Sequence, residues 1–173
     1  MEKQDSGHWQ CQVRLEKREG NIDACKTPEE RLQFLKETKP YKVIEREGNL
    51  LLNEGVNALW SLLCETTSTE TRYTAANARI GVGNGTTAAA ATDTGLAGAS
   101  TAFKAMESGF PTFGTAQKAT FKSSFGDTEA NFAWEEWTID NGATPNKNLN
   151  RKVESLGTKS SGTWTLEVSL TIS

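Results

Sequence analysis

Histidine and cysteine, the residues that most often bind metals or act as nucleophiles, are scarce in this chain. Its 173 residues include one histidine, His8, and three cysteines, Cys11, Cys25 and Cys64. His8 and Cys11 could supply two zinc ligands, but no compact second pair accompanies them. The odd number and wide spacing of the cysteines are not those of a disulfide framework, and a Cys–His nucleophile pair would have to use His8. We therefore expect free thiols, no metal, no cofactor and no catalytic residue.

Excess positive charge and long apolar runs are also lacking. Lys and Arg number 19 against 22 Asp and Glu, and the net charge of −3 offers no general attraction for phosphate backbones. No apolar run approaches the roughly 20 residues that a membrane-spanning helix needs. The first residues do not show a basic region followed by an apolar stretch, which is the pattern of a secretory signal. We therefore expect no nucleic-acid partner, no membrane and synthesis in a cytoplasm.

The charge that is present is concentrated near the N-terminus. Residues 15–19 read Leu-Glu-Lys-Arg-Glu, whereas the chain after about residue 48 is poor in charge and rich in small residues. This contrast predicts a charged N-terminal arm or peripheral subdomain over residues 1–40 and a β-rich core domain over residues 41–173. The length suits one domain with an appended arm.

The strongest pattern lies at the end of the chain, in residues 163–173. Apolar and polar residues alternate there without a break, and the apolar face consists of Trp164, Leu166, Val168, Leu170 and Ile172. Successive side chains of a strand point to opposite faces, so this period of two predicts a half-buried strand. Similar patterns predict strands over residues 9–16, 41–46, 78–82 and 119–125.

A further strand is predicted over residues 131–139, with a break in its alternation. Trp134 lies on one face and Trp137 on the other if the pairing is regular. One extra residue at Glu135-Glu136 would return both tryptophans to the core, which is what a β-bulge does. We interpret the two glutamates as a solvated pair without a catalytic role.

Two segments predict helices. Thr27 can act as an N-cap, with Pro28 at the first helical position and Glu30 completing a capping box. Over residues 49–63, spacings of three and four predict a helix whose apolar face covers one side of a sheet, formed by Leu52, Val56, Leu59, Trp60 and Leu63. Gly55 weakens this helix, which favours a close packing contact at that position.

The glycine-rich stretch 81–87 resembles a phosphate-binding loop only superficially. It lacks the lysine of a Walker loop, and its third glycine comes one residue too early for a dinucleotide-binding fingerprint. We interpret it as a turn that ends a strand. The Ala, Thr and Gly residues over 86–101 are too small to build a core, which predicts a surface loop.

Together these patterns predict a mainly β protein, a β-sandwich or jelly-roll-like fold with one packed α-helix and an N-terminal arm. The tryptophans at positions 60, 134, 137 and 164 lie on the expected core faces. Trp9 stands apart in the charged zone, where it could hold the arm on its own core or anchor it on another subunit. Trp9, Val13 and Leu15 alternate with polar residues, and we expect this face of the arm to contact a surface outside its own domain.

Four stretches, taken in order, resemble a known group of proteins. They are residues 49–60 (Asn-Leu-Leu-Leu-Asn-Glu-Gly-Val-Asn-Ala-Leu-Trp), 78–85 (Ala-Arg-Ile-Gly-Val-Gly-Asn-Gly), 131–137 (Asn-Phe-Ala-Trp-Glu-Glu-Trp), and 149–151 leading through 156–159 to the strand of Trp164. This order is similar to that of small virion structural proteins of tailed bacteriophages, encoded among the head genes. The resemblance covers about residues 41–173 and is closest to capsid decoration, or cement, proteins.

The resemblance implies a structural protein of the virion, and we expect a non-enzymatic protein on the capsid surface. Its expected partners are the major capsid protein and copies of itself, since a trimer would match a capsid threefold axis. Trp9, Val13 and Leu15 are the expected contacts to the capsid or to another subunit. Two alternatives remain open. One is a tail or fibre component involved in host attachment. The other is a small hydrolase, which the lack of a base–nucleophile pair outside His8 disfavours.

Overall fold

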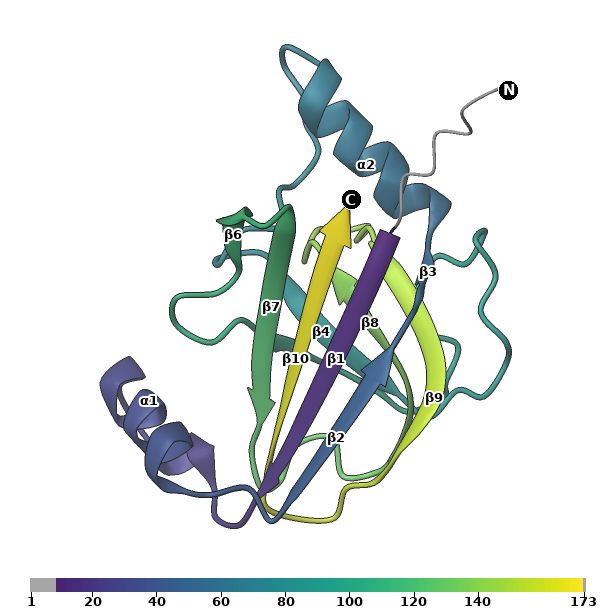
Figure 1. Ribbon diagram of the computed structural model, residues 1–173. Helices are drawn as coiled ribbons and strands as arrows, with labels where there is room; N and C mark the ends of the chain where they lie inside the picture. Colours follow the sequence, from purple (N-terminus) through teal and green to yellow (C-terminus); the bar gives the residue numbers. More distant parts are fainter. Residues whose placement is uncertain (1–8, 173) are drawn as a thin grey trace, which may run out of the picture.

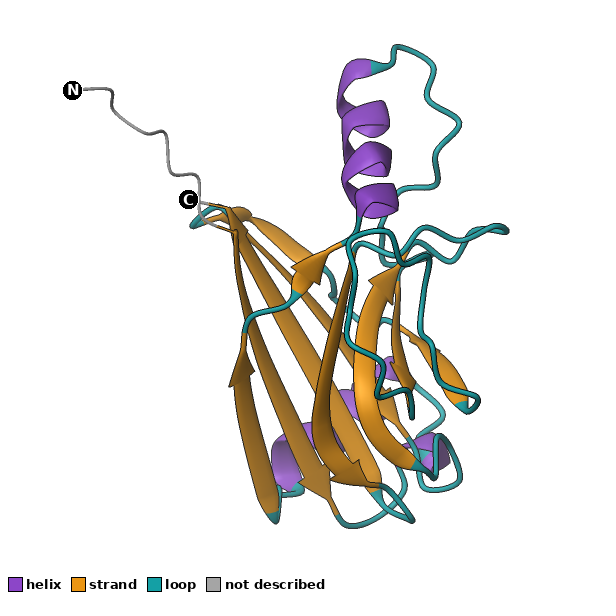
Figure 2. Ribbon diagram, turned by 90° about the vertical axis from the view of Figure 1, so that its right-hand side faces the viewer, coloured by secondary structure: helices purple, strands orange, loops and turns teal. Residues whose placement is uncertain are grey.

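Ten strands form two antiparallel sheets that pack face to face as a β-sandwich (Figures 1 and 2) in the computed structural model, which describes residues 9–172. The predicted mainly β sandwich is therefore confirmed. The first sheet has the order β2 (Lys42–Glu47), β1 (Trp9–Arg18), β10 (Thr163–Ile172), β7 (Lys118–Phe125) and β6 (Thr112–Thr115). The second has the order β3 (Leu50–Leu51), β9 (Asn150–Thr158), β8 (Ala133–Asp140), β4 (Arg79–Gly83) and β5 (Thr101–Ala105).

Strand β10 has the predicted alternation and lies at the centre of the first sheet. Its core-facing side chains from Trp164 to Leu170 are at most 4% exposed, whereas Ile172 at its end is 60% exposed. Ten residues of β1 pair with β10, from Trp9 opposite Ile172 to Arg18 opposite Thr163. The predicted strand in the first zone of the sequence is thus confirmed, but its partner lies at the other end of the chain.

The expectation that residues 1–40 form an arm apart from a core domain of residues 41–173 is wrong for β1. This strand lies between β2 and β10, and its side chains Val13 and Leu15 are 2% and 0% exposed. Both pack in the core of their own domain, so they cannot serve as contacts to the capsid or to another subunit. Residues 1–8 of the predicted arm, which include His8, lie outside the described residues.

Three aromatic rings join the two sheets near the lower ends of β7 and β10. Trp134 packs edge-on against Phe125 and Trp164, with ring centroids 4.9 and 5.0 Å apart. Trp137 is likewise 0% exposed, although it comes three residues after Trp134 in β8. The register between β8 and β9 shifts between Trp134 and Glu136, so the predicted place of the irregularity is confirmed. The predicted extra residue at Glu135-Glu136 is wrong, because β8 advances by two residues over this interval while β9 advances by four.

Glu136 is buried, contrary to the expectation of a solvated pair of glutamates. Its Oε1 accepts hydrogen bonds from the backbone N–H groups of Gly85 (3.1 Å) and Gly98 (2.7 Å), and its Oε2 lies 2.7 Å from the Arg151 guanidinium. Each of these contacts gives a partner to a polar group whose burial without one would cost free energy. The segment between β4 and β5, predicted as a surface loop, is therefore fastened to the second sheet at both of its ends.

Helix α1 (Pro28–Glu37) begins with the predicted capping box between Thr27 and Glu30. It lies beside the lower end of the sandwich and has no buried residue (Figure 1). Arg31 holds it there through two bonds to the Glu107 carboxylate, at 2.5 and 3.2 Å. The short 3-10 helix η1 (Ile22–Ala24) precedes it.

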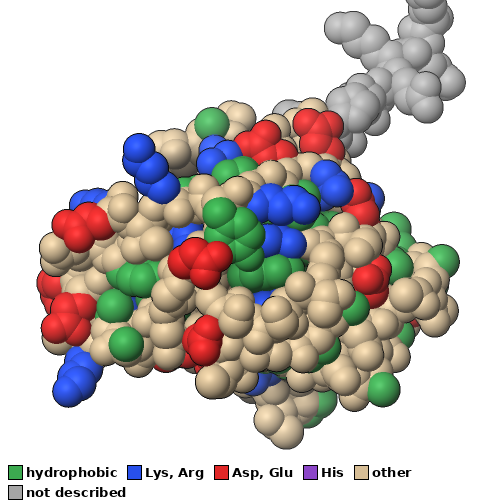
Figure 3. All heavy atoms as spheres, turned by 90° about the horizontal axis from the view of Figure 1, so that it is seen from below, with side chains coloured by type: hydrophobic (Ala, Val, Ile, Leu, Met, Phe, Trp, Pro, Cys, Tyr) green, Lys and Arg blue, Asp and Glu red, His purple; other side chains and the backbone are tan. Residues whose placement is uncertain are grey.

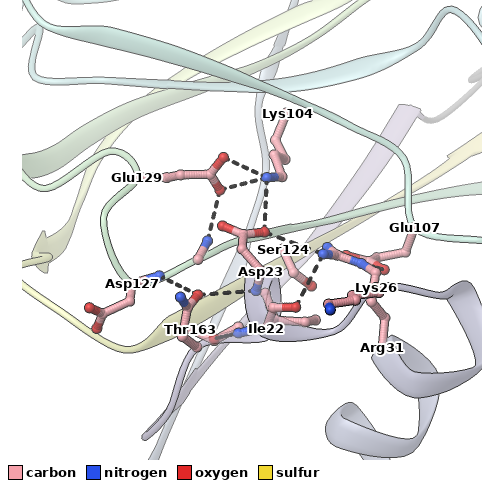
Figure 4. Close-up of polar contacts among 12 residues, drawn as sticks. Ile22, Asp23, Lys26, Arg31, Lys104, Glu107, Ser124, Asp127, Glu129 and Thr163 are labelled. Carbon is pink, nitrogen blue, oxygen red and sulfur yellow. Dashed lines mark hydrogen bonds and ion pairs between the residues drawn. The ribbon is translucent and has the colours of Figure 1, made fainter.

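A network of ion pairs joins η1 and α1 to the strands and their connections (Figure 4). Asp23 of η1 accepts from Arg31 and from Lys104 of β5, each at 3.3 Å, and Lys104 also contacts both oxygens of Glu129 at 2.6 Å. Figure 3 shows acidic, basic and hydrophobic side chains mixed over this lower end of the molecule. The charges named above are therefore paired with one another within the chain.

Helix α2 (Asn53–Cys64) stands off the opposite, upper end of the sandwich (Figures 1 and 2). The prediction of a helix here is confirmed, but the expectation that it covers one side of a sheet is wrong. Neither helix in the described part of the chain is long and apolar enough to cross a membrane.

Candidate functional site

The first turn of α2 is tightly held. The Glu54 carboxylate accepts hydrogen bonds from the backbone N–H of Asn148 at 2.7 Å and from its side-chain amide at 3.0 Å. Gly55 lies so close to the connection between β8 and β9 that a Cβ added to it would be 2.5 Å from Cα of Leu149. The close packing expected at Gly55 is therefore confirmed, and it fixes the direction in which the helix leaves the sandwich.

The rest of α2 exposes the apolar face that the sequence predicts. Only Gly55 and Ala58 of this helix are buried. Leu63 is 74% exposed and Leu59 37%. Trp60, which was expected in the core, is 59% exposed. A large exposed apolar patch is more informative than a single exposed residue, because in soluble proteins it marks an interaction site.

An apolar groove of about 590 Å³ runs between α2 and the end of the first sheet. Its floor contains Leu51, Trp9 at the start of β1 and Ile172 at the end of β10. Its wall is formed by side chains of α2, chiefly Val56, Leu59, Trp60 and Leu63. Every residue that lines this groove is apolar.

A second hollow, of about 310 Å³, continues the groove toward β6 and β7. The two share Trp9, Leu59 and Ile172, and the second extends over Leu170 and Gly114. The surface composed of this groove, this hollow and the exposed face of α2 is called the α2 surface below. It brings together residues from the beginning, the middle and the end of the chain.

Trp9 has a fixed place in the α2 surface. Its indole N–H donates to Asn49 Oδ1 at 2.7 Å, while its ring packs against the hydrophobic core and lines the groove. Of the three contact residues predicted from the sequence, Trp9 lies in this surface, whereas Val13 and Leu15 lie in the core. The alternation of β1 places all three on one face, but Trp9, the first residue of the strand, is only partly buried and lines the groove.

Charge is nearly absent from α2. Between Gly55 and Cys64 the helix carries no ionisable side chain other than the thiol of Cys64, and Glu54 already bonds to Asn148. Helix α1, in contrast, contains three glutamates, one arginine and one lysine. The two helices therefore differ in chemistry: α1, at the lower end, is charged and paired, whereas α2, at the upper end, exposes an apolar face.

The buried ion pairs of the molecule hold its structure together. Arg151 contacts Glu136 and also Asp93 at 2.6 Å, and Arg79 binds the Asp140 carboxylate through two nitrogens, the nearer at 2.5 Å. Sequence reasoning missed the Glu136–Arg151 pair. A signal for it was present in Gly83 and Gly85, because a Cβ on either residue would collide with the Glu136 carboxylate.

The cysteines occupy three separate environments. Burial raises the pKa of the Cys11 thiol to about 12, Cys25 is half-buried and Cys64 is exposed at the end of α2. Among residues 9–172, no group of three His, Cys, Asp or Glu side chains is arranged to hold a metal ion. Comparison of the chain with protein-family models, curated proteins and solved structures finds no match.

Proposed function

We propose that this chain is a non-enzymatic structural protein of a tailed-bacteriophage particle, which binds the outside of the capsid lattice and stabilises it. The observation that carries the proposal is the exposed α2 surface, because a rigid sandwich that ends in an uncovered apolar helix is suited to working within an assembly. The resemblance of residues 49–60, 78–85 and 131–137 to virion proteins supports a bacteriophage particle as that assembly.

The internal ion pairs also support a structural role. Glu136, Asp140 and Glu107 are each 8% exposed or less, and each is matched by an arginine. A carboxylate held in this way orders loops and strand ends. In the proposed particle the chain contacts the major capsid protein and copies of itself.

Many weak contacts on a symmetric lattice can hold such a protein firmly. Each copy needs only modest affinity if a closed oligomer engages several capsid sites at once, because the later contacts are intramolecular. A trimer would match the threefold axes of a capsid. The protein would be made in the host cytoplasm and would join the particle there.

The copy number in purified particles tests this proposal. Particles made from a genome that encodes this chain would be purified, and the chain would be quantified by mass spectrometry against the major capsid protein. A decoration protein is expected in hundreds of copies, on the order of one per lattice position. A handful of copies would place the chain in the tail and favour the attachment role, and its absence from particles would refute both.

A second measurement tests the capsid contact itself. Purified protein would be added to empty heads that lack it, and bound protein would be recovered by sedimentation. We expect saturable binding and heads that resist heating better than undecorated ones. Heads that bind no protein and gain no stability would contradict the decoration role.

A further inference from the structure

The α2 surface is too apolar to be explained by the isolated chain. Trp60, Leu63, Leu59 and Ile172 together expose on the order of 400 Å² of apolar surface, which on a monomer is typical of a functional patch. The last two turns of α2 gain little from their own domain, because only the first turn is hydrogen-bonded to it. Something other than the described part of the chain is needed to cover this helix.

The shape of the surface indicates a helical occupant. Val56, Leu59, Trp60 and Leu63 are spaced by three, one and three residues, so they form one stripe along α2. The groove beside the stripe is open and apolar. An amphipathic helix binds such a groove through side chains with the same spacing, and α2 itself has this spacing.

The preceding residues of the chain are poor candidates for this role. The eight residues before Trp9 read Met-Glu-Lys-Gln-Asp-Ser-Gly-His, without an aromatic or β-branched side chain. Helix α1 is also unsuitable, because five of its ten residues are charged. Binding of α1 in the uncharged groove would remove water from these charges without giving them partners, which costs free energy.

We propose that the α2 surface is the contact between copies of this chain: the Val56–Leu63 face of α2 in one copy packs in the groove of a second copy. The two faces match in chemistry, since α2 presents no charge from Gly55 to Leu63 and every residue that lines the groove is apolar. Two copies that each carry a net charge of −3 can therefore meet here without placing like charges together.

The area is sufficient for a stable contact. Each contact buries the apolar patches of both copies, on the order of 800 Å² in total, before any polar rim is counted. With the neighbouring side chains Asn53, Asn57 and Ser61 as rim, the contact passes the roughly 1,000 Å² expected of a specific interface. This self-association does not depend on the chain being a virion protein.

Sedimentation equilibrium of the full chain tests the proposal. The wild type is expected to exceed the monomer mass of 18.8 kDa at concentrations up to about 100 μM. Leu63→Gln should weaken association at least tenfold, because it replaces the most exposed leucine of the apolar contact with an amide. The matched control is Leu32→Gln on α1, since Leu32 is also an exposed helical leucine, at 52%, but lies at the other end of the molecule.

Circular dichroism and thermal unfolding would show that both variants keep the fold. A wild type that remains monomeric at about 100 μM would overturn the proposal, and so would an oligomer that Leu63→Gln leaves intact. A monomer that binds empty heads through Leu63 would also overturn it, and would assign the α2 surface to the capsid protein instead. In that case the proposed function would stand while the self-association would not.

Discussion

Glu136 in β8 and Arg151 in β9 form an ion pair 2.7 Å apart, and their side chains are 0% and 1% exposed. The pair holds more than two strands together. Glu136 also accepts from the backbone of Gly85, Ala97 and Gly98. The guanidinium donates to the carbonyl of Thr87 at 3.0 Å. A loop of small residues, which has little apolar surface to bury, is thereby ordered through its backbone.

Loss of the Glu136 charge should be costly. In Glu136→Gln, Arg151 keeps only Asp93 as a charged partner, and we expect a loss of about 2 to 3 kcal/mol in the free energy of unfolding. Chemical denaturation would measure it. Glu135→Gln is the control: Glu135 is partly exposed and bonds to Ser155, so its replacement should change stability by less than about 0.5 kcal/mol. Equal effects of the two variants would contradict the structural role of Glu136.

Gly55→Ala should destabilise the protein, although alanine favours helices. In an isolated helix this change would stabilise by about 1 kcal/mol. In the folded protein the new Cβ would lie 2.5 Å from Leu149 Cα and 2.6 Å from the Asn148 carbonyl, so the helix must move and the Glu54 bonds must loosen. Thermal unfolding of Gly55→Ala and of the exposed Asn57→Ala would be compared. We expect opposite signs, and stabilisation by both changes would show that α2 is not tightly held.

Lys17 should make stability depend on pH in the alkaline range. Its ammonium is buried, donates to the Leu156 carbonyl at 2.7 Å and lies 3.5 Å from the centroid of the Trp164 ring. Burial, helped by the nearby charge of Lys42, lowers its pKa from 10.5 to about 8. Between these values the unfolded chain binds more protons than the folded chain, so this group makes the protein more stable as the pH rises.

A comparison with Lys17→Met isolates that effect. The free energy of unfolding of the wild type, minus that of the variant, should increase by about 2 kcal/mol between pH 8 and pH 10. Cys11, whose pKa burial raises, acts in the opposite direction but is common to both proteins. Parallel curves of stability against pH would show that Lys17 keeps an ordinary pKa in the folded state.

Removal of residues 1–40 should prevent folding. The deletion takes away β1, which pairs with β10 on one side and β2 on the other. A sharp thermal transition of the truncated protein would contradict this expectation. Single substitutions test the same point: Leu15→Ala, at a buried position, should cost about 2 to 5 kcal/mol, while Val43→Ala, at a position 40% exposed, should cost far less.

The predictions that held depend on residues close together in the sequence. The alternation from Trp164 to Leu170, the capping box of Thr27 and Glu30, and the place of the register shift before Trp137 are confirmed. In each case a local rule of strand or helix geometry determines which side chains share a face. Strand β9 was not predicted, because its sequence, Asn-Arg-Lys-Val-Glu-Ser-Leu-Gly-Thr, carries charged residues and does not alternate cleanly.

The predictions that failed concern the partner against which an apolar face of a helix or strand packs. A stripe such as that of Leu59, Trp60 and Leu63 has the same spacing whether it covers its own sheet or another molecule. A strand rich in charge, such as β1, can be a separate arm or an inner strand of a sheet. The outcome depends on whether it pairs with a distant strand, as β1 does with β10. The sequence by itself determined the periodicity of strands and helices, since periodicity is a property of neighbouring residues. Only the tertiary structure decided that Val13 and Leu15 are core, that Glu136 is buried against Arg151, and that Trp60 is exposed, because these outcomes depend on pairing between distant segments of the chain.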